Sequence, residues 1–337
     1  MQAIAAFART EVVSMNADPE APEISILVSS YNHASFVADA VRSCLEQSGV
    51  ALEVLVIDDG STDDSVAQLR SIQDPRLRVF TQENRGLSRA LNRVLAEARG
   101  SWVKFLPSDD RLLPDCLAKQ LAAAHGSIAS FCLPEVVDAS LRPLEDPAPQ
   151  AWFDVPEARG AQVVTDLLDR NCLSAPCGLF SRAAAVEIGG FDASMRVAQD
   201  YDLWLRLASL GDLHRFPERL VQVRWHGANQ SGEVSASSEQ ERARALVGSL
   251  RRDGLPLWCE RMESQTGSRS QALEALVAAL LDSGLAEVHG FVEELAAEIR
   301  QAGGGLDFDP RLAAIVVASP ELPATAGAGG RPEREPS

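Results

Sequence analysis

The sequence lacks any long uninterrupted hydrophobic run, although 46% of its 337 residues are hydrophobic. No window reaches the ~18 consecutive apolar residues that a helix needs to span a bilayer. The segment from Met1 to Phe7 is too short and too weakly basic for a secretory signal. We therefore expect a cytoplasmic protein with enough chain for one large α/β domain and a smaller piece.

Paired cysteines and an excess of basic residues are also missing. The six cysteines are scattered, and Cys172 and Cys177 have no second pair with which to complete a zinc site. We interpret the cysteines as buried, reduced thiols. The net charge of −17 argues against nucleic acid as a partner, because duplex binding needs a basic face. It also disfavours a broad electrostatic hold on anionic lipid.

Three apolar segments, each typical of a buried strand, end in polar or acidic residues. The segment 24–29 leads to Ser30 and Tyr31, 53–57 leads to Asp58 and Asp59, and 102–106 leads to Ser108, Asp109 and Asp110. In an open α/β sheet, ligands bind outside the carboxyl ends of the strands. Buried acids are costly when they have no partner, so we expect these to hold something polar.

Helical patterns alternate with the apolar segments in the first part of the chain, which predicts parallel βαβ units. We predict helices at about 34–47, 63–72, 87–98 and 114–124 and a short strand at 76–81. The rhythm then changes. We predict strands at 128–138, 171–181 and 220–226, helices at 161–170 and 200–210, and a long loop at 141–160.

Seven short motifs in a fixed order carry the strongest functional signal. They are VSSYN at 28–32, VIDDGSTD at 56–63, NRGLSRALN at 84–92, FLPSDD at 105–110, GGFD at 189–192, QDYDLWLR at 199–206 and RWHGANQS at 224–231. This ordered set resembles the family 2 glycosyltransferases with a GT-A fold over about residues 24–232. The resemblance implies a three-layer α/β sandwich around a mostly parallel central sheet.

The resemblance also divides the chain. We expect a leader at 1–22, the GT-A-like glycosyltransferase domain at 23–232, a helical C-terminal extension at 233–318 and a disordered tail at 319–337. Amphipathic helices are predicted in the extension near 236–252, 270–282 and 287–302, and their apolar faces must be covered by something. Packing on the sheet, homodimerisation, and docking on a partner enzyme or peripherally at the inner face of the membrane all stay open.

The implied activity is inverting transfer of a sugar from a nucleotide-sugar donor, preferably UDP-linked, to a hydroxyl acceptor that is a glycan, a lipid-linked sugar or another alcohol. The first acid of the Asp58–Asp59 pair would accept the imide N–H of the base, and Tyr31 would lie against its ring. The alternative for Asp59 is capping of the turn and the next helix. The resemblance assigns the nucleotide-sugar site to Ser30, Tyr31, Asp58, Asp59, Arg89, Ser108 and Asp109.

A divalent cation, Mg²⁺ or Mn²⁺, is the implied cofactor. The family usually has an acid, any residue and a second acid at the third strand corner, and the second acid, matched here by Asp109, coordinates the metal. Pro107 replaces the first acid. Mg²⁺ is commonly held by one or two carboxylates plus phosphates and water, so the loss should weaken binding without abolishing it. His226 is the second candidate ligand, although a structural role is the plainer alternative.

Asp200 is the implied general base, which takes the proton from the acceptor hydroxyl. The family usually has Glu-Asp at this point, and Gln199 replaces the glutamate here. N-capping of the helix at 200–210 is an alternative role for Asp200, and both can hold at once.

Two rival functions follow from the same residues. The losses at Pro107 and Gln199 also suit a catalytically impaired, glycosyltransferase-like protein that only binds a nucleotide sugar. A nucleotidyltransferase is disfavoured, because no Gly-rich, Lys- or Arg-containing loop follows the first strand.

Overall fold

Continuous β-branched and leucine runs produce the centre of the molecule, because strands buried on both faces need apolar side chains in both directions. The computed structural model describes residues 21–146, 148–226, 236–253, 280, 288 and 290–292. Neighbouring strands here are parallel, in the order β3-β2-β1-β4. These strands are β1 (Ile24–Ser30), β2 (Leu52–Asp58), β3 (Leu77–Thr81) and β4 (Trp102–Pro107).

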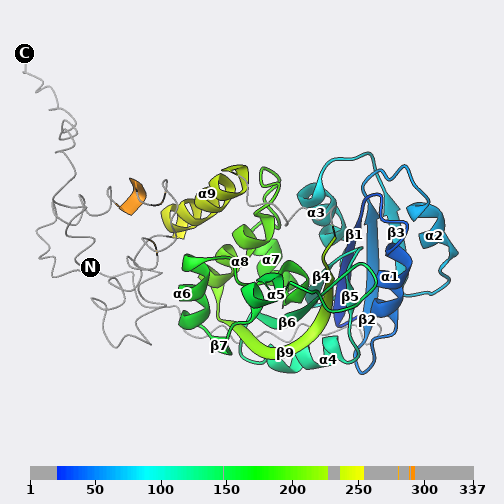
Figure 1. Ribbon diagram of the computed structural model, residues 1–337, viewed down its shortest axis with the longest axis horizontal. Helices are drawn as coiled ribbons and strands as arrows, with labels where there is room; N and C mark the ends of the chain where they lie inside the picture. The colour runs from blue at the N-terminus through cyan, green and yellow to red at the C-terminus, as the bar shows by residue number, and fades with distance from the viewer. Residues whose placement is uncertain are drawn as a thin grey trace, which may run out of the picture.

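Alternate residues of β1 feed two separate hydrophobic cores. Ile26 and Val28 belong to the core covered by α1 (Val37–Leu45), α2 (Ser65–Ser71) and α4 (Cys116–Ala123). Leu27 faces the other core, which holds α3 and several helices from later in the chain. This alternation follows from the two-residue period of a strand. The result is the predicted helix–sheet–helix sandwich (Figure 1).

The second part of the chain extends the sheet with mostly antiparallel pairs. The described residues form one nine-stranded mixed sheet in the order β3-β2-β1-β4-β8-β6-β9-β5, with β7 paired to β9. The added strands are β5 (Arg111–Leu112), β6 (Ala129–Val137), β7 (Ala158–Arg159), β8 (Gly178–Ser181) and β9 (Leu213–Arg224). The helices are α3 (Leu87–Glu97), α5 (Ala148–Phe153), α6 (Ala161–Asp169), α7 (Arg182–Glu187), α8 (Gln199–Leu210) and α9 (Ala236–Asp253).

The structure differs from the sequence predictions mainly in this second part. The predicted loop at 141–160 contains helix α5 and strand β7. The predicted strand at 171–181 is extended only from Gly178, because a 3₁₀ turn, Ala175–Cys177, precedes it and includes Pro176, which has no N–H for a strand ladder. The predicted strand at 220–226 is the end of the longer β9.

Helix α9 confirms the first predicted helix of the C-terminal extension. Most of the regions predicted as helices at 270–282 and 287–302 lie outside the described residues, as do almost all of the leader and the whole tail. The domain boundaries therefore stay predictions. Within the described part of the chain, no helix is both long enough and apolar enough to cross a bilayer.

Candidate active site

The register of the parallel strands places the predicted donor residues at one edge of the sheet. Ser30 of β1 pairs with Asp58 of β2, and Ser29 pairs with Pro107 of β4. The backbone continues this alignment, since the Asp59 amide donates to the Ser30 carbonyl over 2.9 Å and the Ser108 amide to the Ser29 carbonyl over 3.0 Å. The polar and acidic residues at the ends of the three strands thus leave the sheet side by side.

Asp58 is buried and is held by its own turn. Its Oδ1 accepts from the Ser61 amide over 2.8 Å, and its Oδ2 accepts from the Ser61 hydroxyl over 2.6 Å. Gly60, with φ of 86°, makes this turn possible, because a Cβ there would lie 2.9 Å from the Asn84 amide nitrogen. An ionised carboxylate has about four lone-pair sites, so Asp58 keeps acceptor capacity for a ligand.

Asp59 connects this turn to the start of α3. Its Oδ1 accepts from the Gln82 side chain over 2.7 Å and from the Arg85 amide over 2.9 Å, and its Oδ2 accepts from the Gly86 amide over 2.8 Å. Gly86 is the N-cap of α3, so Asp59 caps α3 rather than the helix that directly follows it in sequence. These three bonds provide a structural role for Asp59, and a nucleotide contact stays a prediction.

Tyr31 and Arg89 lie on the exposed part of this edge. The Tyr31 side chain follows β1 and is 47% exposed, so its ring is accessible to a planar base. Arg89, on α3, is also exposed, and its Nη1 donates to the Arg85 carbonyl over 3.5 Å. Ser108 is fully buried, and its hydroxyl lies 2.8 Å from His33 Nδ1.

Three loops bring two histidines to Asp109. His226 Nε2, after β9, lies 3.2 Å from Asp109 Oδ2, and His33 Nδ1, after β1, lies 4.0 Å from Asp109 Oδ1. The His226 ring stacks on Phe36 with centroids 5.3 Å apart. The two predicted metal ligands, Asp109 and His226, are therefore neighbours, and His33 is an additional residue that the sequence reasoning missed. Its position directly after the polar end of the first strand was the available signal.

The donor chemistry of this cluster decides whether it fits a divalent cation. Among the described residues, no set of three or more His, Cys, Asp and Glu side chains is arranged to hold a metal by itself. A carboxylate and an imidazole at 3.2 Å nevertheless fit an ion that takes its remaining ligands from a diphosphate and water. The donor set of Asp109 and His226 therefore fits Mg²⁺ or Mn²⁺ in the presence of a phosphorylated ligand.

Asp110 and Arg224 fix the backbone behind Asp109. The Arg224 amide donates to Asp110 Oδ1 over 2.9 Å, and its guanidinium donates to the Asp109 carbonyl and to Asp39. The same guanidinium lies 5.2 Å from the centre of the Phe36 ring. Burial, together with the charge of Asp109, raises the pKa of the Asp110 carboxyl well above its usual range. Asp110 thus acts in the scaffold rather than on a ligand.

Asp200 lies in the first turn of α8, where the N-cap is Ala198. Its Oδ1 accepts from the Tyr201 amide over 2.7 Å, and its Oδ2 accepts from the Asn171 side chain over 3.3 Å. Burial raises the pKa of the Asp200 carboxyl to about 6, because desolvation disfavours the charged form. A carboxyl with this pKa is well suited to accept a proton near neutral pH.

The segment that leads into α8 is attached to α3. Ser88 Oγ donates to the Met195 carbonyl over 3.0 Å, and Asn92 exchanges two hydrogen bonds with the Phe191 backbone, at 2.7 and 2.8 Å. Asp59 binds the start of the same helix. Helix α3 therefore connects the carboxyl edge of the sheet to the segment that leads into α8, the helix that carries Asp200. A common cleft for Asp58, Asp109 and Asp200 stays a prediction.

Trp152 lies on α5, is connected to Asp200 through Asn171, and was not predicted as a site residue. Its indole Nε1 donates to the Asn171 carbonyl over 3.0 Å, and the Asn171 side chain is the one that contacts Asp200. The Arg170 guanidinium lies 5.2 Å from the centre of the indole ring. The side chain remains 46% exposed. Because α5 falls in a segment rich in Pro and acids, no periodic signal distinguished Trp152.

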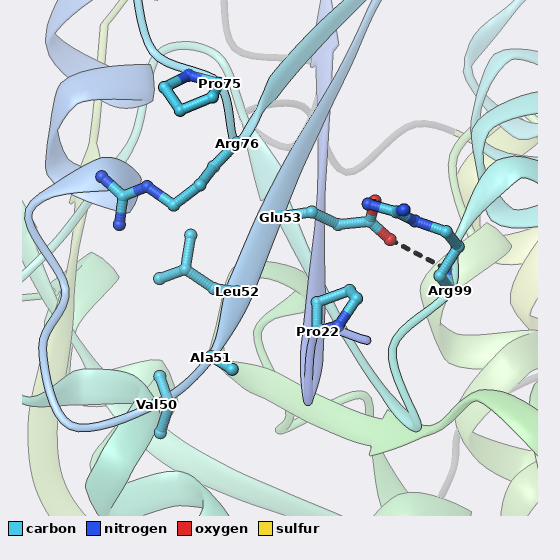
Figure 2. A pocket seen from close by; sticks show the side chains of 8 residues that line it. All are labelled: Pro22, Val50, Ala51, Leu52, Glu53, Pro75, Arg76 and Arg99. Atoms are coloured by element: carbon cyan, nitrogen blue, oxygen red, sulfur yellow. Dashed lines mark hydrogen bonds and ion pairs between the residues drawn. The ribbon is translucent and has the colours of Figure 1, made fainter. Parts of the chain in front are cut away.

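A separate pocket lies at the opposite edge of the sheet. Figure 2 shows that its lining comes from residues at or just before the starts of the parallel strands, with the Glu53 side chain directed toward Arg99. Glu53 accepts from the Arg99 amide over 2.8 Å and from the Ser25 hydroxyl over 2.7 Å. None of the predicted site residues lines this pocket.

Comparison with known sequences agrees with the motif order. The profile of the family described as Glycosyl transferase family 2 matches residues 25–189. The Mycobacterium tuberculosis protein MT1568 is 30% identical over 239 residues, which cover 68% of this chain and 74% of that protein. The succinoglycan biosynthesis protein ExoO of Rhizobium meliloti is 36% identical over 121 residues, covering 36% of this chain and 35% of its own length.

Comparison with solved structures supports the fold. TarS 1–349 of S. aureus, in complex with UDP-GlcNAc, superposes with a TM-score of 0.57 at 16% identity, covering 85% of this chain and 94% of that one. The mannosyltransferase PcManGT of Pyrobaculum calidifontis, in complex with GDP-Man and Mn²⁺, gives a TM-score of 0.51 at 19% identity, with 88% and 86% covered. The three-layer fold is thus shared with transferases of the GT-A type.

Proposed function

Since the chain belongs to glycosyltransferase family 2, we propose that it transfers a sugar from a UDP-linked donor to an acceptor hydroxyl with inversion at the anomeric carbon. The observation that carries this proposal is the contact between Asp109 and His226 at the sheet edge that Asp58 also occupies. This edge is where α/β sheets bind their ligands.

The donor base is proposed to bind between Asp58 and Tyr31. A buried carboxylate with spare acceptor capacity suits the imide N–H of uracil, and an exposed ring suits stacking. TarS was solved with UDP-GlcNAc and PcManGT with GDP-Man, so nucleoside diphosphate sugars of either base bind to proteins of this fold. For this chain we propose uracil, because the Asp58 carboxylate can accept its imide N–H.

Asp109 and His226 are the residues proposed to hold Mg²⁺ or Mn²⁺ beside the diphosphate. When bound, the cation would neutralise negative charge on the leaving group, which is worth several kcal/mol of transition-state stabilisation. The first of the two acids that the family usually has at this corner is replaced by Pro107. Metal affinity should therefore depend strongly on the diphosphate itself.

Asp200 is proposed to act as the general base. Its carboxylate takes the proton of the acceptor hydroxyl while that oxygen forms a bond to the anomeric carbon. The bond between the anomeric carbon and the diphosphate breaks, and its electron pair leaves with the diphosphate oxygen. Asn171 donates to Oδ2 of Asp200, so it orients the carboxylate while Oδ1 faces the helix backbone. A base placed in this way contributes roughly 10²–10⁴ in rate.

Trp152 is proposed to form part of the acceptor subsite. Its indole is fixed by the bond to the Asn171 carbonyl, yet almost half of the side chain is open to solvent. An aromatic ring that is held in place by Asn171, the residue that also contacts Asp200, presents an apolar surface to which a sugar ring can pack at little entropic cost. The acceptor class that this arrangement favours is a glycan.

The test is a panel of UDP, GDP and TDP sugars with Mn²⁺, in which released nucleotide is measured with and without glycan acceptors. The proposal expects nucleotide release with one donor class, dependent on Mn²⁺. The absence of both turnover and nucleotide binding would refute it. Tight donor binding by calorimetry, without turnover and without any effect of Asp200→Asn, would favour the alternative of a binding protein.

A further inference from the structure

Helix α9 lies beyond the family match, which ends at residue 189, and packs alongside α8 (Figure 1). Its apolar residues Ala243, Leu246 and Leu250 belong to the same core as α3 and α8. The Arg242 guanidinium lies 5.9 Å from the centre of the Tyr201 ring, next to the proposed base in sequence. The extension is therefore in direct contact with the helix that carries Asp200.

Glu241 on α9 binds the backbone immediately before α8. A single oxygen, Oε2, accepts from three consecutive amides, those of Arg196 at 2.9 Å, Val197 at 2.7 Å and Ala198 at 3.1 Å. The Glu241 residue is only 6% exposed. Burial alone would raise the pKa of the Glu241 carboxyl, but the three amides hold that pKa below its ordinary value. The carboxylate is therefore charged and fully engaged at neutral pH.

The position of these amides explains why the contact matters. The first amides of a helix and its cap have no partner within the helix and need an external acceptor. The N-cap of α8 is Ala198, whose methyl group cannot accept a hydrogen bond, and no side-chain cap bond is made there. Glu241 supplies an acceptor from a different element for the Ala198 amide and for the two amides that precede the helix, and its negative charge lies at the positive end of the α8 dipole.

We infer that Glu241 is a positioning residue for Asp200: it fixes segment 196–198 and so sets where Asp200 lies and how deeply it is buried. The inference rests on the proposed role of Asp200 as general base. Asp200 lies two residues after Ala198, the last residue whose amide Glu241 binds, so displacement of this segment moves the carboxylate directly. Two arginines of α9 lie close to these groups: Arg244 is 3.9 Å from Glu241 Oε1, and Arg242 lies over the ring of Tyr201, the residue after Asp200.

Three variants distinguish the role of the acceptor oxygen of Glu241 from the role of its negative charge. Glu241→Ala removes the acceptor, whereas Glu241→Gln keeps one carbonyl oxygen that can receive the same amides. Glu241→Asp keeps the charge but shortens the reach by one methylene, and it replaces Glu241→Ala if the latter fails to fold. Ser181→Ala is the matched control, because Ser181 Oγ accepts from the Ala184 amide as the N-cap of α7, at the other edge of the sheet.

The experiment measures kcat, the donor KM and the pH profile of kcat. We expect Glu241→Ala to lower kcat by ~10–100-fold, as misplacements of about 1 Å do, with the donor KM unchanged. The acid limb of the profile should move to lower pH, because a released Asp200 becomes hydrated and its pKa falls toward the ordinary value. Glu241→Gln should restore most of kcat and the parental limb, and Ser181→Ala should lower thermal stability alone.

An acid limb that does not move in Glu241→Ala, or a fall in kcat no larger than that of Ser181→Ala, would overturn the inference. Asp200→Asn is measured in parallel. If Asp200→Asn retains activity, the proposed base is wrong and with it the role assigned to Glu241. If Asp200→Asn is inactive, the Glu241 series alone decides whether α9 positions the base.

Discussion

The two halves of the chain place their site residues by different means. In the first half, Asp58 is set by strand register and by Ser61, only three residues further along the chain. In the second half, Asp200 contacts Asn171, 29 residues away, and the segment before α8 is held by Glu241, up to 45 residues away. The position of Asp58 is thus specified by a local motif, whereas the position of Asp200 depends on distant side chains that lie outside the motifs.

The largest effect should come from the base itself. Asp200→Asn keeps the size of the side chain and an oxygen for Asn171, but it cannot take a proton at neutral pH. We expect kcat to fall by roughly 10²–10⁴-fold. Calorimetry should show unchanged donor affinity, because the base does not belong to the donor half. Equal losses in donor binding and kcat would show that the two halves are not separate.

Asp109→Asn tests the donor half with the same chemical change. Replacing the carboxylate weakens the proposed metal contact, so we expect kcat to fall by about 10²-fold, in line with several kcal/mol of Lewis-acid stabilisation. Titration with Mn²⁺ should show that higher metal concentrations recover part of the rate. A variant whose Mn²⁺ dependence equals that of the parent would exclude Asp109 as a ligand.

The pH dependence of the parent enzyme should follow the ionisation of Asp200 in the second half of the chain. The pKa of Asp200 is about 6, and only the ionised carboxylate accepts a proton. The rate should therefore be level above this pKa and fall as pH decreases through it, approaching tenfold per pH unit. Initial rates between pH 5 and 8 at saturating donor and acceptor measure this limb. An acid limb near pH 4 would mean that the base is an ordinary exposed carboxyl.

The neighbouring acids of the donor half should respond differently to one substitution. Asp58→Asn presents a side-chain amide to the uracil and should weaken UDP binding about tenfold. Stability should change little, because the Ser61 hydroxyl can accept from the new amide instead of donating to the carboxylate. Asp59→Asn turns an N–H group toward the amides at the start of α3 and should cost about 1–3 kcal/mol of unfolding free energy. Urea denaturation and UDP titration of both variants check the contrast, and interchanged results would reverse the two roles.

The smallest effect is expected at the acceptor side. Trp152→Ala should raise the acceptor KM by roughly 3–10-fold, since an aromatic contact contributes about 0.5–1.5 kcal/mol. The donor KM should be unchanged, and Trp152→Phe should recover the stacking but not the bond to the Asn171 carbonyl. Acceptor titrations at saturating donor measure this, and a change confined to the donor KM would place Trp152 elsewhere in the reaction.

The sequence predicts one half of the molecule better than the other for a physical reason. Strands β1 and β2 are found within two residues of their bounds, because buried parallel strands need continuous apolar runs. Helix α5 was missed, because a short helix in a segment rich in Pro and acids has no periodic signal. The resemblance identified Asp109, His226 and Asp200 as candidates, and the contact between the first two is present.

Residues whose position depends on tertiary contacts could not be found in this way. Asn171, Trp152 and Glu241 belong to no motif, and each matters only because of what folding brings beside it. His33 is intermediate, since it follows the polar end of the first strand but reaches Asp109 only through the parallel alignment of β1 and β4.

A structure of the protein with UDP and Mn²⁺ tests the shared site most directly. We predict the diphosphate and the metal next to Asp109 and His226, the uracil between Asp58 and Tyr31, and Asp200 facing the diphosphate across a space that a sugar and an acceptor hydroxyl can fill. A nucleotide bound at another edge of the sheet, or Asp200 directed away from the diphosphate, would contradict it.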